Sequence, residues 1–228
     1  MRTLRFLSAL LVCFVLATGS AFAAAQNQPP NADKFQSAIE LAKNKDFAGA
    51  RKILKPLADG NDPVAQYFMG VMFIEESQGT GPKLKEAETW LAKSSQSGYP
   101  VASLQLASLY GSGKLGTADF KKARAELNKV IQSKIDAPEF DLRVRSMALI
   151  GLGAMQMEGQ GGPKEPQKGV ENFRKAAKMG NPIAMLNIGR AYKLGVGVKQ
   201  DNKQAKEWFG KAKAAGIPEA QQEIDAIQ

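Results

Sequence analysis

A short motif that recurs at near-constant spacing limits what this sequence can fold into. A proline, one further residue and an alanine occur four times, and a fifth segment carries serine in place of the proline. The five motifs are Pro63-Val64-Ala65, Pro100-Val101-Ala102, Ser146-Met147-Ala148, Pro182-Ile183-Ala184 and Pro218-Glu219-Ala220. Their alanines are 37, 46, 36 and 36 residues apart. Such a period predicts stacked units, each too small to bury its apolar face alone.

Each unit is predicted to contain two antiparallel helices. Proline is favoured in the first turn of a helix, where its missing N–H costs nothing, so each motif should begin a helix. A small residue follows five positions after the alanine and should allow a neighbouring helix to approach closely. These small residues are Gly70, Ala107, Gly153 and Gly189. A glycine-rich turn and a second helix follow, and three second helices should end at a glycine. The glycines at these three ends are Gly98, Gly180 and Gly216.

The repeated segments resemble a known family. Residues 65–73 and 184–192 resemble the first helix of Sel-one-like repeats, and residues 195–216 resemble their loop and second helix. The resemblance covers most of residues 62–228. It implies an all-α fold, a right-handed superhelical α-solenoid of stacked antiparallel helix pairs. It also implies a scaffold that contacts other proteins.

The predicted layout follows from these motifs and from the glycine-rich turns. We expect repeats at 62–98, 99–145, 146–181 and 182–217, preceded by a tetratricopeptide-like pair at 34–60 and followed by a capping helix at 218–228. The second repeat is about ten residues too long. Its excess lies near 131–140 and would fit a longer second helix or a projecting loop.

The N-terminus has the three regions of a signal peptide in order. A short basic start precedes an apolar run from Phe6 to Leu16, and Ala21-Phe22-Ala23 fits a cleavage site. We expect residues 1–23 to be removed after Ala23, or alternatively after Ala25, and residues 24–33 to form a flexible linker. Export to the periplasm or secretion would follow, and no later apolar stretch is long enough for a membrane span.

The composition excludes several kinds of chemistry. The chain has no histidine, and its only cysteine, Cys13, lies within the predicted signal peptide. Catalytic triads, Cys–His pairs and the usual zinc sites are therefore absent from the mature chain, and we expect no cofactor, no metal and no enzymatic activity. Carboxylates such as Glu75, Glu76 and Glu158 leave a hydrolase as a remote alternative. Trp90 and Trp208 could stack on sugars, but their recurrence favours core packing.

The net charge favours an anionic partner. It is +9, and removal of Arg2 and Arg5 with the signal peptide would leave +7. An acidic protein face, a polysaccharide or a lipid surface would fit this sign, whereas nucleic acid is not expected outside the cytoplasm. Lysines that merely solvate helix surfaces explain the charge equally well.

A partner-binding face is predicted on the first helices. The positions three and six residues after each alanine should face away from the packed side, and their residues vary between units. On this basis we select Phe68, Val71, Gln105, Ser108, Asn187 and Arg190. The hypothesis is a periplasmic scaffold or adaptor that binds a protein through a concave surface. A binder of cell-wall or exopolysaccharide chains is the alternative, and the stripe could also be plain exposed surface.

Overall fold

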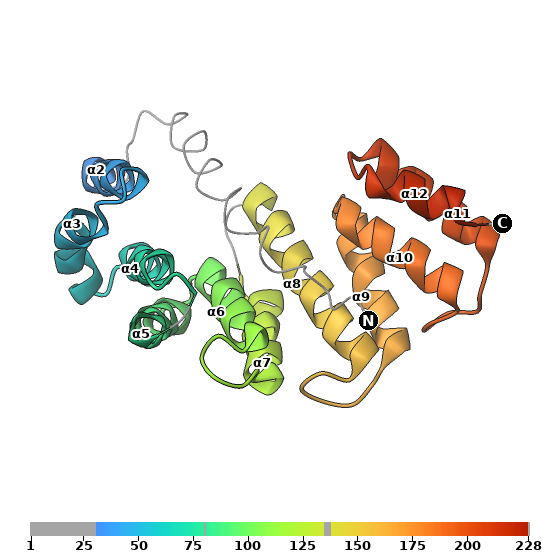
Figure 1. Cartoon of the computed structure of the whole chain (residues 1–228), viewed down its shortest axis with the longest axis horizontal. Helices are drawn as coiled ribbons and strands as arrows, with labels where there is room; N and C mark the ends of the chain where they lie inside the picture. Colours follow the sequence, from blue (N-terminus) through green and yellow to red (C-terminus); the bar gives the residue numbers. More distant parts are fainter. Residues whose placement is uncertain (1–30, 80, 135–137, 228) are drawn as a thin grey trace. The chain divides into compact units, whose positions relative to one another are not determined.

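The computed structural model describes residues 31–79, 81–134 and 138–227, which form eleven helices and no strand (Figure 1). The predicted signal peptide lies outside these residues, as does most of the predicted linker. Helix α2 (Ala32–Lys43) begins two residues before the predicted end of that linker. The all-α expectation is confirmed for the described residues. They divide into two compact units. The first ends at Ser97, and the second begins at Gly98.

The first unit consists of four helices, each packed on the next in chain order. These are α2, α3 (Phe47–Asp59), α4 (Pro63–Glu76) and α5 (Pro82–Gln96). Aspartates fix two of the helix starts: the Asp46 carboxylate accepts from the backbone N–H of Gly49, and the Asp62 carboxylate accepts from those of Val64 and Ala65. One apolar cluster of this unit is built mainly from alanine and methionine, and its buried members are Ala38, Ala50, Leu54, Ala58, Ala65, Met69 and Met72.

The second unit continues the alternation of first and second helices. It contains α6 (Pro100–Ser112), α7 (Phe120–Gln132), α8 (Pro138–Glu158), α9 (Pro166–Lys178), α10 (Pro182–Leu194), α11 (Asn202–Ala214) and the short α12 (Glu219–Asp225). Prolines occupy the first turn of α6 and α10, as the recurring motif predicts, and Pro166, which is not part of that motif, occupies the first turn of α9. Consecutive helices contact one another from α6 to α12, so each second helix is stacked beside the next first helix.

Glycines in the first helices bring the two helices of a pair into close contact. A methyl group added to Gly70 would lie 2.6 Å from Leu91 Cγ. A methyl group added to Gly153 would lie 2.7 Å from Phe173 Cε1, and one added to Gly189 would lie 2.5 Å from Phe209 Cδ1. Leu91, Phe173 and Phe209 occupy the same position in the second helices α5, α9 and α11. The predicted close approach at the small residue is therefore confirmed, and a Leu or Phe side chain fills the space that glycine leaves open.

Two of the glycine turns also join neighbouring repeats. A methyl group on Gly161 would lie 2.3 Å from the carbonyl oxygen of Phe120, at the start of the preceding second helix. A methyl group on Gly197 would lie 2.4 Å from the carbonyl oxygen of Pro166. Both glycines have positive φ, 70° and 75°, which also favours glycine. These turns therefore set the spacing between repeats as well as reversing the chain.

Much of the excess length of the second repeat belongs to the helix after it. Helix α7 has 13 residues, the same length as α9 and α11, whereas α8 has 21 and begins at Pro138. Arg145 of α8 donates hydrogen bonds to the carbonyls of Ile131 and Ser133 and pairs with Asp141 at 2.6 Å. Of the two expected alternatives, a longer second helix is not present. Arg145 instead joins the extended start of α8 to the end of α7. Asp136 and Ala137 lie outside the described residues.

Substitution of two glycines should separate close packing from helix propensity. Gly189→Ala places a methyl group against the buried Phe209 ring and should lower the free energy of unfolding by about 1–3 kcal/mol. Gly210→Ala is the matched control, because Gly210 lies within α11 and nothing is within 4 Å of its added methyl group. It should raise the free energy of unfolding by about 0.5–1 kcal/mol. Urea unfolding of both variants measures the difference, and a stabilising Gly189→Ala would contradict the close contact.

Candidate partner-binding faces

Phe68 and Val71 of α4 are both half-buried. The Phe68 ring centroid lies 6.0 Å from that of Phe35 in α2 and 5.5 Å from that of Tyr67. Phe68 therefore packs against the core of the first unit, on the side where Phe35 of α2 approaches α4. Its apolar character has an internal explanation, so it does not by itself indicate a partner.

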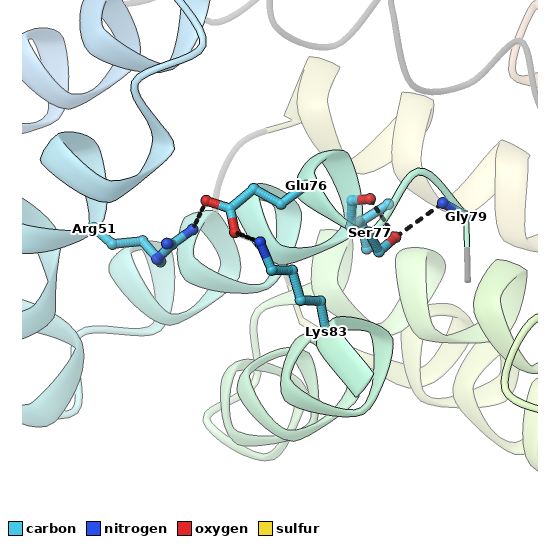
Figure 2. Close-up of polar contacts among 6 residues, drawn as sticks. Arg51, Glu76, Ser77, Gly79 and Lys83 are labelled. Carbon is cyan, nitrogen blue, oxygen red and sulfur yellow. Dashed lines mark hydrogen bonds and ion pairs between the residues drawn. The ribbon is translucent and has the colours of Figure 1, made fainter. Parts of the chain in front are cut away.

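The end of α4 is held by a carboxylate between two cations (Figure 2). Glu76 accepts from Arg51 of α3 through one oxygen and from Lys83 Nζ of α5 at 2.6 Å through the other. The Glu76 side chain is only 12% exposed. Beside it, the Ser77 hydroxyl donates to the Ile74 carbonyl at 2.6 Å and accepts from the Gly79 N–H at 3.1 Å. Glu76 thus joins three successive helices of the first unit.

The pKa of Glu76 fits this joining role and does not fit general-acid chemistry. Burial of the carboxyl raises its pKa, but hydrogen bonds and charges from Lys83 and Arg51 outweigh burial and bring the pKa below the ordinary 4.5. A general acid that works near neutral pH needs a raised pKa instead. Glu75 and Glu158, the other two acids selected from the sequence, are exposed. The site chemistry at these carboxylates therefore does not favour the hydrolase alternative.

Three polar residues on the first helices of the second unit have no internal partner. Gln105 and Ser108 of α6 and Asn187 of α10 are half-buried. Within the described residues, none of these three side chains forms a hydrogen bond with the chain itself. The same two positions on α8 hold Gly151 and Ala154, which are also half-buried and carry no polar side chain. Hydrogen-bond donors and acceptors are therefore available on α6 and α10, whereas α8 between them contributes only small side chains to this face.

Arg190, the remaining predicted site residue, is held by the capping helix. Its Nε donates to Glu223 of α12 at 2.7 Å, and Lys193 Nζ lies 2.9 Å from the other Glu223 oxygen. Burial raises the pKa of Glu223, but hydrogen bonds from Arg190 and Lys193 outweigh burial and bring it below the ordinary value. Arg190 therefore fastens α12 to α10.

Both tryptophans contribute to the core, as their recurrence predicts. Trp90 and Trp208 pack against the apolar clusters of the first and second unit, respectively. In each case a lysine three residues later lies over the ring, with Lys93 Nζ 4.3 Å and Lys211 Nζ 4.2 Å from the ring centroids. One face of each ring is therefore occupied by an ammonium group, which argues against sugar stacking on that face.

A recurrence of lysine on the second helices is the feature that the sequence-based reasoning missed. Lysine stands at the same position in all four second helices, six residues after Ala87, Ala123, Gly169 and Ala205. The four are Lys93, Lys129, Lys175 and Lys211, and all are exposed. Their spacing of 36, 46 and 36 residues equals that of these small residues, so aligning the repeats would have revealed the recurring lysine from the sequence.

The described residues contain neither a cluster of metal ligands nor a membrane-spanning helix. No group of three or more potential metal ligands of the His, Cys, Asp and Glu types occurs in this part of the chain. None of its helices combines the length and the apolar character that crossing a membrane requires.

These features define an all-helical repeat protein built from paired helices. A Sel1 repeat family model matches residues 63–99, 100–125, 146–181 and 182–217, which is more than half of the chain. The chain therefore belongs to the Sel1 repeat family, and the resemblance stated from the sequence is confirmed.

Known proteins share this fold over most of the chain. A Sel1 repeat protein from Oxalobacter formigenes matches with a TM-score of 0.66 and 24% identity, over 83% of this chain and 74% of that one. A protective antigen present in uropathogenic Escherichia coli strains matches with a TM-score of 0.67 and 24% identity, over 84% of this chain and 39% of that one. Cytochrome c oxidase assembly factor 7 of Xenopus tropicalis is 27% identical over 82% of this chain and 80% of its own length.

The ionised Glu76 should stabilise the first unit in a pH-dependent way. Because its pKa is lowered in the folded chain, its contribution is present above the ordinary pKa of 4.5 and is lost as the pH falls through the folded pKa. Glu76→Gln should therefore lower the free energy of unfolding by about 1 kcal/mol at pH 7 and have little effect near pH ~3. Urea unfolding at both pH values measures this. Glu75→Gln, at an exposed neighbour, is the control, and an equal loss in both variants would contradict the joining role.

Proposed function

We propose that this protein is an exported, non-enzymatic adaptor that binds a protein partner through the first helices of its second unit. One observation carries the proposal: Gln105, Ser108 and Asn187 have half-exposed polar side chains that hydrogen-bond to no other residue in the part of the chain that the structure describes. Water can serve these polar groups in the free protein, since none of them is a buried atom left without a partner. A partner that replaces this water with hydrogen bonds of its own would gain specificity there.

The sequence at this face supports protein recognition better than small-molecule binding. Positions three and six differ between the repeats, whereas a small residue on the first helix (Gly or Ala) and a Leu or Phe on the second recur in all four. A surface with a constant scaffold and variable side chains suits an extended partner that differs along its length. First helices generally line the concave side of such stacks, which is where we place the partner.

Relatives support an adaptor role in general terms. The Xenopus relative is named as an assembly factor, and such a name describes a protein that helps other components come together. For this chain the corresponding proposal is that it holds a protein client, of unknown identity, in a defined orientation. The lowered pKa of Glu76 gives no support to acid catalysis.

Export rests on the N-terminal sequence. A basic start, an apolar run and a small-x-small cleavage site are the features by which a secretory signal is recognised. We place the mature protein in the periplasm or outside the cell. There it would act on envelope or extracellular proteins.

Crosslinking in cells should capture the partner from one helix face. Photoreactive residues placed at Gln105 and Asn187 should crosslink to a protein, and residues placed at Asn128 and Gln167, which are exposed on the second helices, should not. After identification by mass spectrometry, the purified partner should bind Asn187→Ala about 5- to 30-fold more weakly than wild type, because a hydrogen-bond partner is lost. Isothermal titration calorimetry measures this. Equal capture from both faces, or unchanged affinity, would refute the assigned face.

Processing of the N-terminus provides a separate test of export. Expression of the full chain should yield a mature protein that begins at Ala24, or at Gln26 if cleavage follows Ala25. N-terminal sequencing and cell fractionation measure this. Deletion of residues 2–23 should leave the protein in the cytoplasm, and an uncleaved chain that fractionates with the cytoplasm in both forms would contradict export.

A further inference from the structure

Positive charge in the second unit is concentrated on one class of helix. Each of the second helices α7, α9 and α11 carries four basic residues and one acidic residue. The first helix α6 carries no charged residue, and α12 carries three acids and no base. The net charge of this unit is therefore not spread evenly over its surface. It lies along the second helices.

Within this charge, one lysine per repeat forms a row. Lys129, Lys175 and Lys211 stand at the same position on α7, α9 and α11, and all three are exposed. Because the helices of this unit contact one another in chain order, equivalent positions on successive second helices face the same way. One lysine of the row comes from each repeat of this unit, and this regular placement distinguishes the row from scattered solvating charges.

Two of the three lysines are held in place by the residue three positions before them. Lys211 lies over the Trp208 ring, with Nζ 4.2 Å from its centroid, and Lys129 pairs with Glu126 at 2.6 Å. In the described residues, no carboxylate lies within ion-pair distance of Lys175, nor of its neighbour Lys178 one turn further along α9. The centre of the row thus carries charge that the chain does not neutralise.

A regular row of lysines matches a linear polymer with regularly spaced anionic groups. Each contact with an exposed lysine is weak, but contacts along one polymer act together because each raises the local concentration for the next. A membrane surface fits less well, since the large exposed apolar side chains of the described residues, Leu142, Ile183 and Leu194, lie on α8 and α10. Nucleic acid also fits less well, because Lys211 occupies the face of Trp208 on which a base would stack.

From these observations we infer that the row formed by Lys129, Lys175 and Lys211 binds a linear acidic polysaccharide, whose carboxylates pair with successive lysines. This surface lies on the second helices, whereas the proposed protein partner binds the first helices. The two activities therefore use different residues, and either can fail without the other.

Binding to polygalacturonate, a linear polymer with a carboxylate on each sugar, tests the inference. The wild-type protein should bind it with an affinity that falls as salt rises, and should not bind neutral dextran. The triple variant K129Q/K175Q/K211Q should bind about tenfold more weakly. A matched variant, K114Q/K164Q/K199Q, removes the same charge from exposed lysines in the turns that follow α6, α8 and α10, and should bind within about twofold of wild type.

A single substitution guards against loss of structure in the triple variant. Lys175→Gln breaks no ion pair, so it should leave the thermal midpoint unchanged and weaken polygalacturonate binding about two- to threefold. Equal weakening in the row variant and the turn variant would overturn the row and leave only general charge attraction. Absence of binding, or equally tight binding to phosphatidylglycerol vesicles or a single-stranded oligonucleotide, would overturn the polysaccharide. If photoreactive residues at Gln105 and Asn187 still crosslink the protein partner in the row variant, the proposed protein-binding face stands whatever the outcome for the polysaccharide.

Discussion

The contact between a glycine and a large apolar side chain sets the geometry of three of the helix pairs, α4–α5, α8–α9 and α10–α11. At Gly70, Gly153 and Gly189 the missing side chain lets the second helix approach until its Leu or Phe lies against the backbone of the first. Neither residue is effective without the other, because a larger residue at the glycine would overpack and a smaller partner would leave a cavity. Each pair then has two outer surfaces. The second helices carry the lysines, and the first helices α6 and α10 carry the polar side chains of Gln105, Ser108 and Asn187.

The periodic sequence made the fold predictable to a useful degree. Proline starts, glycine turns and the close approach of paired helices all followed from residues that recur at fixed spacing. The excess of the second repeat did not follow, because it occurs once and has no counterpart with which to be aligned. Its course depends on Arg145, whose hydrogen bonds to Ile131 and Ser133 join two segments that sequence spacing alone does not bring together.

The candidate face was predictable by position but not by chemistry. Helix periodicity selected six residues on the outer side of the first helices, yet it could not show which of them the chain itself uses. Phe68 packs on Phe35 and Arg190 pairs with Glu223, and both contacts come from helices outside the four repeats. Gln105, Ser108 and Asn187 lack such contacts. Contacts with other helices therefore distinguish residues that the chain itself uses from residues that remain open to a partner, although all six looked equivalent in the sequence.

The pairing of Glu223 with Arg190 and Lys193 bears on how repeats could be added to this chain. Helix α12 buries Ala220, and the following Ile227 packs with it against the same apolar cluster as Phe209 and Ala212, on the surface where a further helix pair would stack. A new repeat after α11 would have to displace α12, whereas a duplication between existing repeats would leave α12 in place. Helix α12 also covers apolar side chains of α11 that would otherwise face solvent, as expected of a helix that closes a stack of repeats.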